Sequence, residues 1–189
     1  MIKLSTNEKT LFILPHLDDE FALAPLIKSF VDANKENCFF LYCAEEILNP
    51  NRLKRRSEAL AVMDYFNVKV DNILFMNDYF SAESRKLYEV FHSAQFLMET
   101  HVKKWQVKQI VTLGFEGGHP DHDVIAILAY QLKCKLSLNV YYAPAYNRHT
   151  VGPFFRIQVC RPLPTQKHLF HMFSINMYAW TSALKIAYL

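Results

Sequence analysis

The stretch Thr10–Glu20 reads TLFILPHLDDE and joins a short apolar run to a dense group of ionisable residues. Residues 10–14 are almost entirely apolar and are bounded by polar residues, which is typical of a strand buried on both faces. Residues 20–33 follow with apolar side chains at helical spacing. We therefore predict a strand at 10–14 and a helix at 20–33, joined by a tight turn that carries the ionisable group.

The same alternation of strand and helix continues along the chain. Further strands are predicted at 38–43, 71–75, 109–113 and 138–142, and further helices at 51–66, 82–105 and 123–133. Asn49 and Pro50 supply an N-cap and a proline at the first helical position for the second helix. Alternating elements of this kind indicate an α/β protein with a mostly parallel sheet and helices on both faces. In such sheets ligands bind beyond the carboxyl ends of the strands.

After residue 142 the alternation weakens. Residues 168–189 form an apolar helix candidate of nearly membrane-spanning length. It is interrupted by His168, His171, Asn176 and Lys185. We expect it to pack on the sheet or on another copy of the chain in a homo-oligomer, with membrane-surface contact as the alternative. The chain is thus predicted to be one domain over residues 1–189, with a core over 1–145 and a divergent C-terminal segment over 146–189.

The composition narrows the class of protein. A hydrophobic fraction of 51% and a charged fraction of 21% describe a folded globular chain and exclude a disordered one. With 21 basic and 18 acidic residues the net charge is +3, which is too balanced to indicate a nucleic-acid partner. The four cysteines form no C-x-x-C pair and predict neither a disulfide framework nor a cysteine zinc site. The N-terminus lacks the layout of a signal peptide, so we expect a cytoplasmic protein.

The first ionisable group, Pro15–Glu20, directly follows the first predicted strand. His16 and Asp19 are three residues apart on the turn, so an imidazole and a carboxylate, both good zinc ligands, can aim at one point. Asp18 lies between them in the sequence and can stay off a metal to accept a proton from its bound water. The alternative is that these acidic residues are ordinary capping residues of the following helix.

The second group, Gly117–Asp123 (GGHPDHD), directly follows the fourth predicted strand. His119 and His122 bracket a proline turn into the next helix, and Asp121 has the same capping alternative. Because both groups lie at the same edge of one predicted sheet, they predict a shared catalytic metal with a position left for water. Such a site suits amide hydrolysis, since the metal both activates water and polarises the carbonyl.

At these residues the chain resembles the PIG-L/LmbE-like family of N-acetylglucosaminyl deacetylases, typified by the GlcNAc-phosphatidylinositol deacetylase and the mycothiol-pathway deacetylase. That family carries a P-H-P-D-D-E type motif after its first strand and an H-P-D-H type motif later. This chain has PHLDDE at 15–20, with Leu17 in place of proline, and HPDH at 119–122. An R-x-x-E pattern of the family is matched by Arg55–Glu58. The resemblance covers roughly residues 10–145.

The resemblance implies a Rossmann-like three-layer αβα fold with the active site at the C-terminal ends of the strands. It implies zinc, or another divalent metal such as Fe²⁺, bound by His16, Asp19 and His122. It also implies that Asp18 is the general base that activates water.

Further roles follow from the same resemblance. His119 would stabilise the oxyanion or help to protonate the leaving amine, and Asp121 would orient one of the metal-binding histidines. Arg55 would bind substrate, with its neighbour Arg56 as the alternative.

The resulting prediction is a zinc-dependent hydrolase that removes an acyl group, above all acetyl, from the nitrogen of a small amino sugar or sugar conjugate, with a glycolipid as one form of that substrate. Two alternatives stay open. One is a metal-dependent esterase or phosphoesterase that uses the same site. The other is a non-catalytic glycan- or glycolipid-binding domain that keeps the motifs as a relic.

Overall fold

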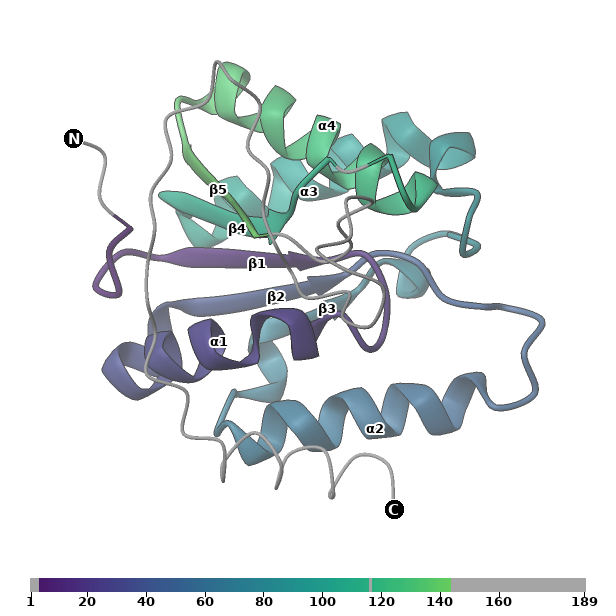
Figure 1. Ribbon diagram of the computed structural model, residues 1–189. Coiled ribbons are helices and arrows are strands. Elements are labelled where there is room, and N and C mark those ends of the chain that lie inside the picture. The colour runs from purple at the N-terminus through teal and green to yellow at the C-terminus, as the bar shows by residue number, and fades with distance from the viewer. Residues whose placement is uncertain (1–3, 116, 144–189) are drawn as a thin grey trace, which may run out of the picture.

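The computed structural model of the chain describes residues 4–115 and 117–143. In these residues five parallel strands form one sheet in the order β3-β2-β1-β4-β5 (Figure 1). The strands are β1 (Thr10–Leu14), β2 (Cys38–Tyr42), β3 (Ile73–Phe75), β4 (Gln109–Leu113) and β5 (Asn139–Ala143). The chain runs outward from β1 to β3 and then returns to β1's other side with β4. The strand order therefore reverses between β1 and β4, which is where doubly wound folds bind ligands.

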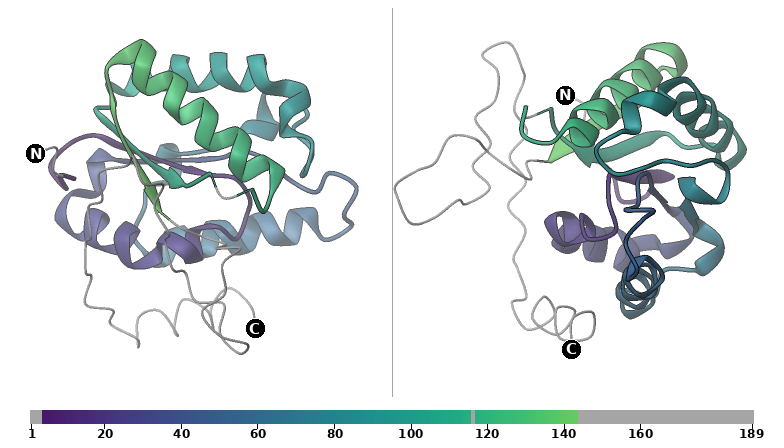
Figure 2. Two further views of the ribbon diagram at one scale, coloured as in Figure 1. Left: turned by 45° about the horizontal axis from the view of Figure 1, so that its top comes forward. Right: turned by 90° about the vertical axis from the view of Figure 1, so that its right-hand side faces the viewer.

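Within the described part of the chain, four helices complete a three-layer αβα arrangement, as the alternation of elements in the sequence predicts. They are α1 (Glu20–Asn34), α2 (Arg52–Tyr65), α3 (Phe91–Trp105) and α4 (Pro120–Leu136). The first two cover one face of the sheet and the last two cover the other (Figures 1 and 2). Short 3-10 turns lie at Lys35–Asn37, Val70–Asn72, Met76–Asp78 and Leu87–Val90.

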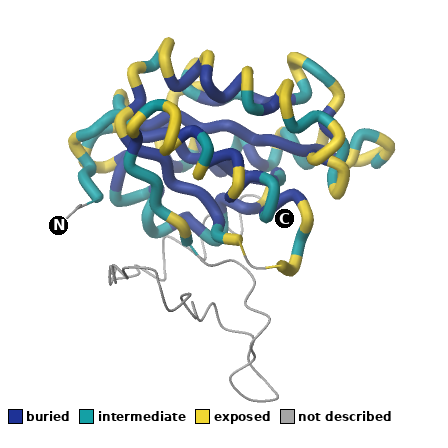
Figure 3. Tube along the Cα trace, turned by 90° about the horizontal axis from the view of Figure 1, so that it is seen from above, coloured by how far each residue is buried: buried dark blue, intermediate teal, exposed yellow. Residues whose placement is uncertain are grey.

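The central strand β1 divides the core into two clusters. Phe12 and Leu14 point toward α1 and α2, whereas Leu11 and Ile13 point toward α3 and α4. All four side chains are fully buried, and Figure 3 shows the buried strands between the more exposed helices. Phe12 also stacks on Phe40, with ring centroids 5.0 Å apart. Burial of each such side chain contributes roughly 1.5–3 kcal/mol, so β1 anchors the loop that follows it.

The helix predicted at 82–105 is shorter in the structure, and this prediction was wrong at its N-terminal end. Its α-helical part begins only at Phe91. The preceding backbone is bonded elsewhere: the N–H of Ser84 donates to the carbonyl of Glu45, and those of Arg85 and Leu87 donate to the carboxylate of Asp121. Since these N–H groups have partners outside a helix, the segment forms a loop that borders the site.

Two other helix starts differ from the prediction. The second helix has Asn51 as its N-cap, and Asn49 instead accepts a hydrogen bond from the N–H of Asn51 at 2.9 Å. The predicted helix at 123–133 begins earlier, at Pro120, so His122 lies in its first turn. This earlier start brings the second motif onto the rigid end of α4.

Among the described residues, no helix combines the length and the apolar character needed to cross a bilayer. The candidate helix at 168–189 lies outside the described residues, as does the rest of the predicted segment 146–189.

Candidate active site

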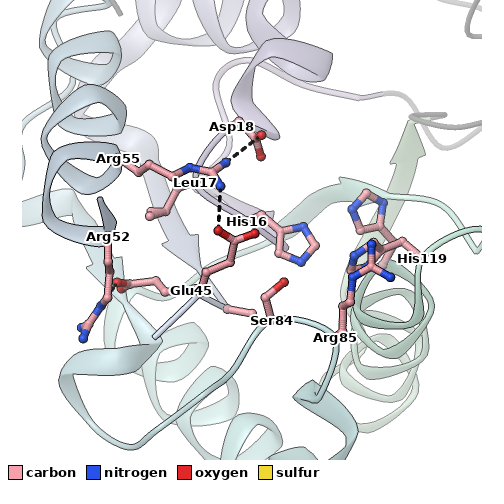
Figure 4. Close-up of a pocket in the computed structure, with 12 residues that line it drawn as sticks. His16, Leu17, Asp18, Glu45, Arg52, Arg55, Ser84, Arg85 and His119 are labelled. Atoms are coloured by element: carbon pink, nitrogen blue, oxygen red, sulfur yellow. Dashed lines mark hydrogen bonds and ion pairs between the residues drawn. The ribbon is translucent and has the colours of Figure 1, made fainter. Parts of the chain in front are cut away.

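The two ionisable motifs meet at the carboxyl ends of β1 and β4. These strands are hydrogen-bonded neighbours, with Ile13 beside Thr112. A cavity of about 180 Å³ opens there (Figure 4). We call it the pocket, and it is lined by residues 16–18, 44–46, 84–85, Arg52, Arg55, His119 and His122. The predicted juxtaposition of the motifs is therefore present in the fold.

Three imidazoles lie together on one side of the pocket. One ring nitrogen from each of His16, His119 and His122 lies within 4.8 Å of the others. The ring centroid of His16 is 4.5 Å from that of His119 and 5.3 Å from that of His122. Imidazole nitrogens so close together are a donor set that suits a divalent transition metal.

Asp19 lies between two of these imidazoles. Its Oδ2 atom is 3.2 Å from Nδ1 of His16 and 3.5 Å from Nε2 of His122. Two ligands that are each about 2.1 Å from a tetrahedral zinc ion lie about 3.4 Å apart, so both spacings fit a shared ion. Asp19 is the N-cap residue of α1, but its side chain makes no capping bond. The carboxylate instead accepts the N–H of His16 at 2.8 Å, and the capping alternative does not describe it.

The acidity of Asp19 reflects the same contacts. Burial alone would raise its pKa, but the hydrogen bonds with His122 and His16 outweigh burial and hold the pKa of this carboxyl well below its usual range. The carboxylate is therefore ionised and available as an oxygen ligand at any physiological pH.

Asp121 holds the other side of the His16 ring. Its Oδ2 atom lies 2.9 Å from Nε2 of His16, and its side chain has no exposed surface. The same carboxylate accepts the N–H groups of Arg85 and Leu87 at 2.6 and 3.1 Å. A carboxylate that holds one imidazole nitrogen fixes the ring and leaves the other nitrogen for a metal. For His16 that other nitrogen is Nδ1, which faces Asp19.

His16 is cationic in the absence of a metal. Burial lowers the pKa of His16, but the hydrogen bonds with Asp121 and Asp19 outweigh burial and raise the pKa to about 9. A proton thus occupies the place between His16 and Asp19 that a metal ion would take.

His119 is the N-cap residue of α4. Its Nδ1 atom accepts a hydrogen bond from the N–H of Asp121 at 3.3 Å. In a neutral imidazole the ring hydrogen must then lie on Nε2. Burial and the charge of His16 lower the pKa of His119, so its imidazole is neutral at neutral pH. The ring therefore presents Nε2–H as a donor at the wall of the pocket.

Asp18 and Arg55 form an ion pair at the mouth of the pocket. Nη2 of Arg55 lies 2.9 Å from Oδ2 of Asp18, and its Nη1 lies 3.4 Å from Oε2 of Glu46 (Figure 4). The Asp18 side chain is 50% exposed. Partial burial and the charge of Asp19 raise the pKa of Asp18, and the charge of Arg55 opposes that rise. Asp18 is thus a carboxylate that lines the same pocket as His16, His119 and His122 and is open to water.

The structure separates Arg55 from its neighbour. Arg56 does not line the pocket, and its guanidinium carbon lies 3.8 Å from the centre of the Phe75 ring. Its Nη2 atom is also 2.5 Å from Oδ1 of Asp78. Arg56 therefore packs α2 against the end of β3, whereas Arg55 reaches the pocket.

The sequence reasoning missed five polar residues that line the pocket: Glu45, Glu46, Arg52, Ser84 and Arg85. Glu45 is only 3% exposed and pairs with Arg52, with Nε 2.6 Å from Oε2. Their positions in the sequence could have indicated them. Residues 44–46 follow the second strand and residues 83–86 form a polar run after the third, and ligands bind at this edge of the sheet.

No protein-family model matches this chain, and no curated protein matches it. Solved structures, in contrast, match it in fold. A complex of a deacetylase with bog from the teicoplanin biosynthesis pathway matches with a TM-score of 0.67 at 13% identity, over 94% of this chain and 82% of that one. The N,N'-diacetylchitobiose deacetylase from Pyrococcus horikoshii matches with a TM-score of 0.61 at 15% identity, over 96% and 70%.

A triple mutant of a deacetylase from the teicoplanin pathway matches with a TM-score of 0.58 at 16% identity. This match covers 71% of the present chain and 63% of the mutant, so the chain spans a little under two thirds of that protein's length. Similarity at such low identity is a statement about architecture. The chain therefore shares its fold with these deacetylase structures.

Proposed function

We propose that this chain is a metal-dependent N-deacetylase that removes an acetyl group from the nitrogen of an amino sugar or sugar conjugate. The observation that carries the proposal is the position of Asp19, whose Oδ2 atom lies between Nδ1 of His16 and Nε2 of His122. Asp18 lies at the mouth of the same pocket. The shared fold supports the proposal, since the similar structures include deacetylases of the teicoplanin pathway and of N,N'-diacetylchitobiose.

His16, Asp19 and His122 would hold the metal. Two nitrogens and one carboxylate oxygen suit zinc, and Fe²⁺ is the alternative with the same ligands. When bound, such an ion polarises the acyl carbonyl and brings the pKa of a coordinated water near neutrality. Asp121 would keep His16 in the tautomer that leaves Nδ1 toward Asp19.

Asp18 would accept the proton of the attacking water. A carboxylate with a raised pKa is a stronger proton acceptor than an ordinary one, and half of this side chain is open to solvent. Arg55 fixes the orientation of that carboxylate through the 2.9 Å ion pair. When substrate enters, Arg55 can exchange one of its two carboxylate partners for a sugar oxygen.

His119 would stabilise the negative charge that develops on the acyl oxygen. Its Nε2–H is a neutral donor held in place by the bond that Nδ1 accepts from Asp121. A fixed donor of this kind contributes about 3 kcal/mol to transition-state stabilisation in other hydrolases. The amine then leaves with the proton that Asp18 accepted from the water, and acetate is released.

The test measures the release of acetate, or of phosphate from the phosphoesters, by purified protein loaded separately with Zn²⁺ and Fe²⁺. The substrates are N-acetylated amino sugars, acetyl esters and phosphoesters. Metal-dependent release of acetate from an N-acetyl sugar is the expected result. Hydrolysis of esters or phosphoesters without any amide cleavage would instead assign an esterase or phosphoesterase. Binding of glycans by metal-loaded protein without turnover would assign a non-catalytic domain.

A further inference from the structure

The wall of the pocket opposite Arg55 is formed by the loop that precedes α3. Ser84 and Arg85 both line the pocket, and Figure 4 shows their side chains on the side where His119 lies, with Arg55 across the opening. Neither residue belongs to the two ionisable motifs. This wall has no role in the proposed chemistry described above.

The backbone of Arg85 has an uncommon conformation. Its φ angle is 68°, in the left-handed region that favours glycine. An arginine there costs about 1 kcal/mol or more, and such conformations concentrate at functional sites. The conformation is held by the fully buried Asp121, which accepts the N–H groups of Arg85 and Leu87. The Arg85 side chain therefore starts from a fixed point beside the metal-binding imidazoles.

Arg85 also differs from the other arginines of the pocket in its charge partners. Arg52 is paired with Glu45 at 2.6 Å, and Arg55 is paired with Asp18 at 2.9 Å. Within residues 4–115 and 117–143, no carboxylate lies in ion-pair distance of the Arg85 guanidinium. Its positive charge is thus available to a ligand in the pocket.

We propose that Arg85, together with the hydroxyl of Ser84, binds an anionic group of the substrate. A guanidinium offers two parallel N–H donors that match the oxygens of a phosphate or a carboxylate, and a hydroxyl adds a third donor. The inference rests on the proposed deacetylase function and specifies its substrate: an acetamido sugar that carries a phosphate or a carboxylate.

The experiment compares kcat/KM of the metal-loaded protein on four compounds: N-acetylglucosamine, its 1-phosphate, its 6-phosphate and N-acetylmuramic acid. The two phosphates and the carboxylate distinguish the sources of negative charge. The variants are Arg85→Gln and Arg85→Lys. Lys86→Gln is the matched control, because Lys86 is exposed in the same loop, carries the same charge and does not line the pocket.

At least one anionic compound should exceed the neutral sugar in kcat/KM by about ten- to hundredfold, as for a charged hydrogen bond. Arg85→Gln should remove this preference, mainly by raising KM for the anionic compounds and with a much smaller effect on the neutral sugar. Arg85→Lys should retain part of the preference, and Lys86→Gln all of it. Equal turnover of neutral and anionic sugars by the unaltered protein would overturn the inference, as would equal losses on both in Arg85→Gln.

A binding measurement separates this inference from the proposed function. If no acetylated sugar is hydrolysed, the deacetylase proposal fails, and titration calorimetry with N-acetylglucosamine 6-phosphate and N-acetylmuramic acid still tests Arg85. Binding that is at least tenfold weaker in Arg85→Gln than in Lys86→Gln supports an anion-binding role. Absence of binding, or equal binding by both variants, rejects it.

Discussion

Nε2 of His16 lies 2.9 Å from Oδ2 of Asp121, and this contact joins the motif after β1 to the motif after β4. The Asp121 carboxylate is fully buried and also accepts the backbone N–H of Arg85. One side chain therefore fixes both His16, a proposed metal ligand, and the loop that forms the pocket wall opposite Arg55. A disturbance at Asp121 should reach metal binding and substrate binding together.

Changing Asp121 to Asn should weaken metal binding by about 10- to 100-fold, because the amide no longer favours the Nε2–H form of His16 as strongly. The affinity is measured by competition with a chelating dye. Asp123→Asn is the control, since Asp123 lies in the same first turn of α4 and its Oδ1 accepts the N–H of Gly117. Equal affinities in the two variants would exclude a positioning role for Asp121.

Changing Asp18 to Asn should leave the metal content intact and lower kcat about 100-fold or more, as for the loss of a general base. Glu46→Gln is the matched control, because Glu46 is the other carboxylate paired with Arg55. That control should keep kcat within about threefold. Full activity of Asp18→Asn would remove Asp18 from its proposed role.

Substitution of Arg55 should affect substrate binding, whereas substitution of Arg56 should affect the stability of the fold. Arg55→Gln should lower kcat/KM with little change in the free energy of unfolding. Arg56→Gln should lower the free energy of unfolding by about 1 kcal/mol, because it loses the contact with the Phe75 ring, and should keep kcat/KM. Steady-state kinetics and urea denaturation of both variants check this. The reverse pattern would show that the pocket assignment of the two arginines is wrong.

Metal affinity should depend on pH through His16. In the metal-free protein the pKa of His16 is about 9, so a proton must leave before the metal binds. The apparent affinity should therefore fall about tenfold for each pH unit below 9, and binding at pH 7.5 should release about one proton. Calorimetry in buffers of different ionisation enthalpy measures that proton. An affinity that is constant between pH 7 and 9 would contradict the protonated state of His16.

The parts of the fold that could be predicted are those set by local sequence. The run at 10–14 is apolar and bounded by polar residues, and the strand has those limits in the structure. The run at 109–113 behaves in the same way. The meeting of the two motifs was predictable as well, because parallel strands place their carboxyl ends at one edge.

The parts that could not be predicted depend on distant contacts. The segment at 82–90 has helical spacing, but Asp121, 36 residues from Arg85 in the chain, accepts the N–H groups of Arg85 and Leu87. These contacts hold the segment as a loop followed by a 3-10 turn. Such tertiary contacts override local propensity and leave no local signal. Arg55 and Arg56 are adjacent in the sequence, so only the position of α2 decides which one reaches the pocket.

The central claim is that His16, Asp19 and His122 share one divalent ion, and metal content tests it most directly. Purified unaltered protein, His122→Ala, Asp19→Asn and His119→Ala are loaded with Zn²⁺, dialysed and measured by elemental analysis, with circular dichroism to confirm folding. We predict about one ion per chain in the unaltered protein and in His119→Ala, and a large loss in the other two variants. Full occupancy in His122→Ala, or retention in Asp19→Asn with loss in His119→Ala, would contradict the claim.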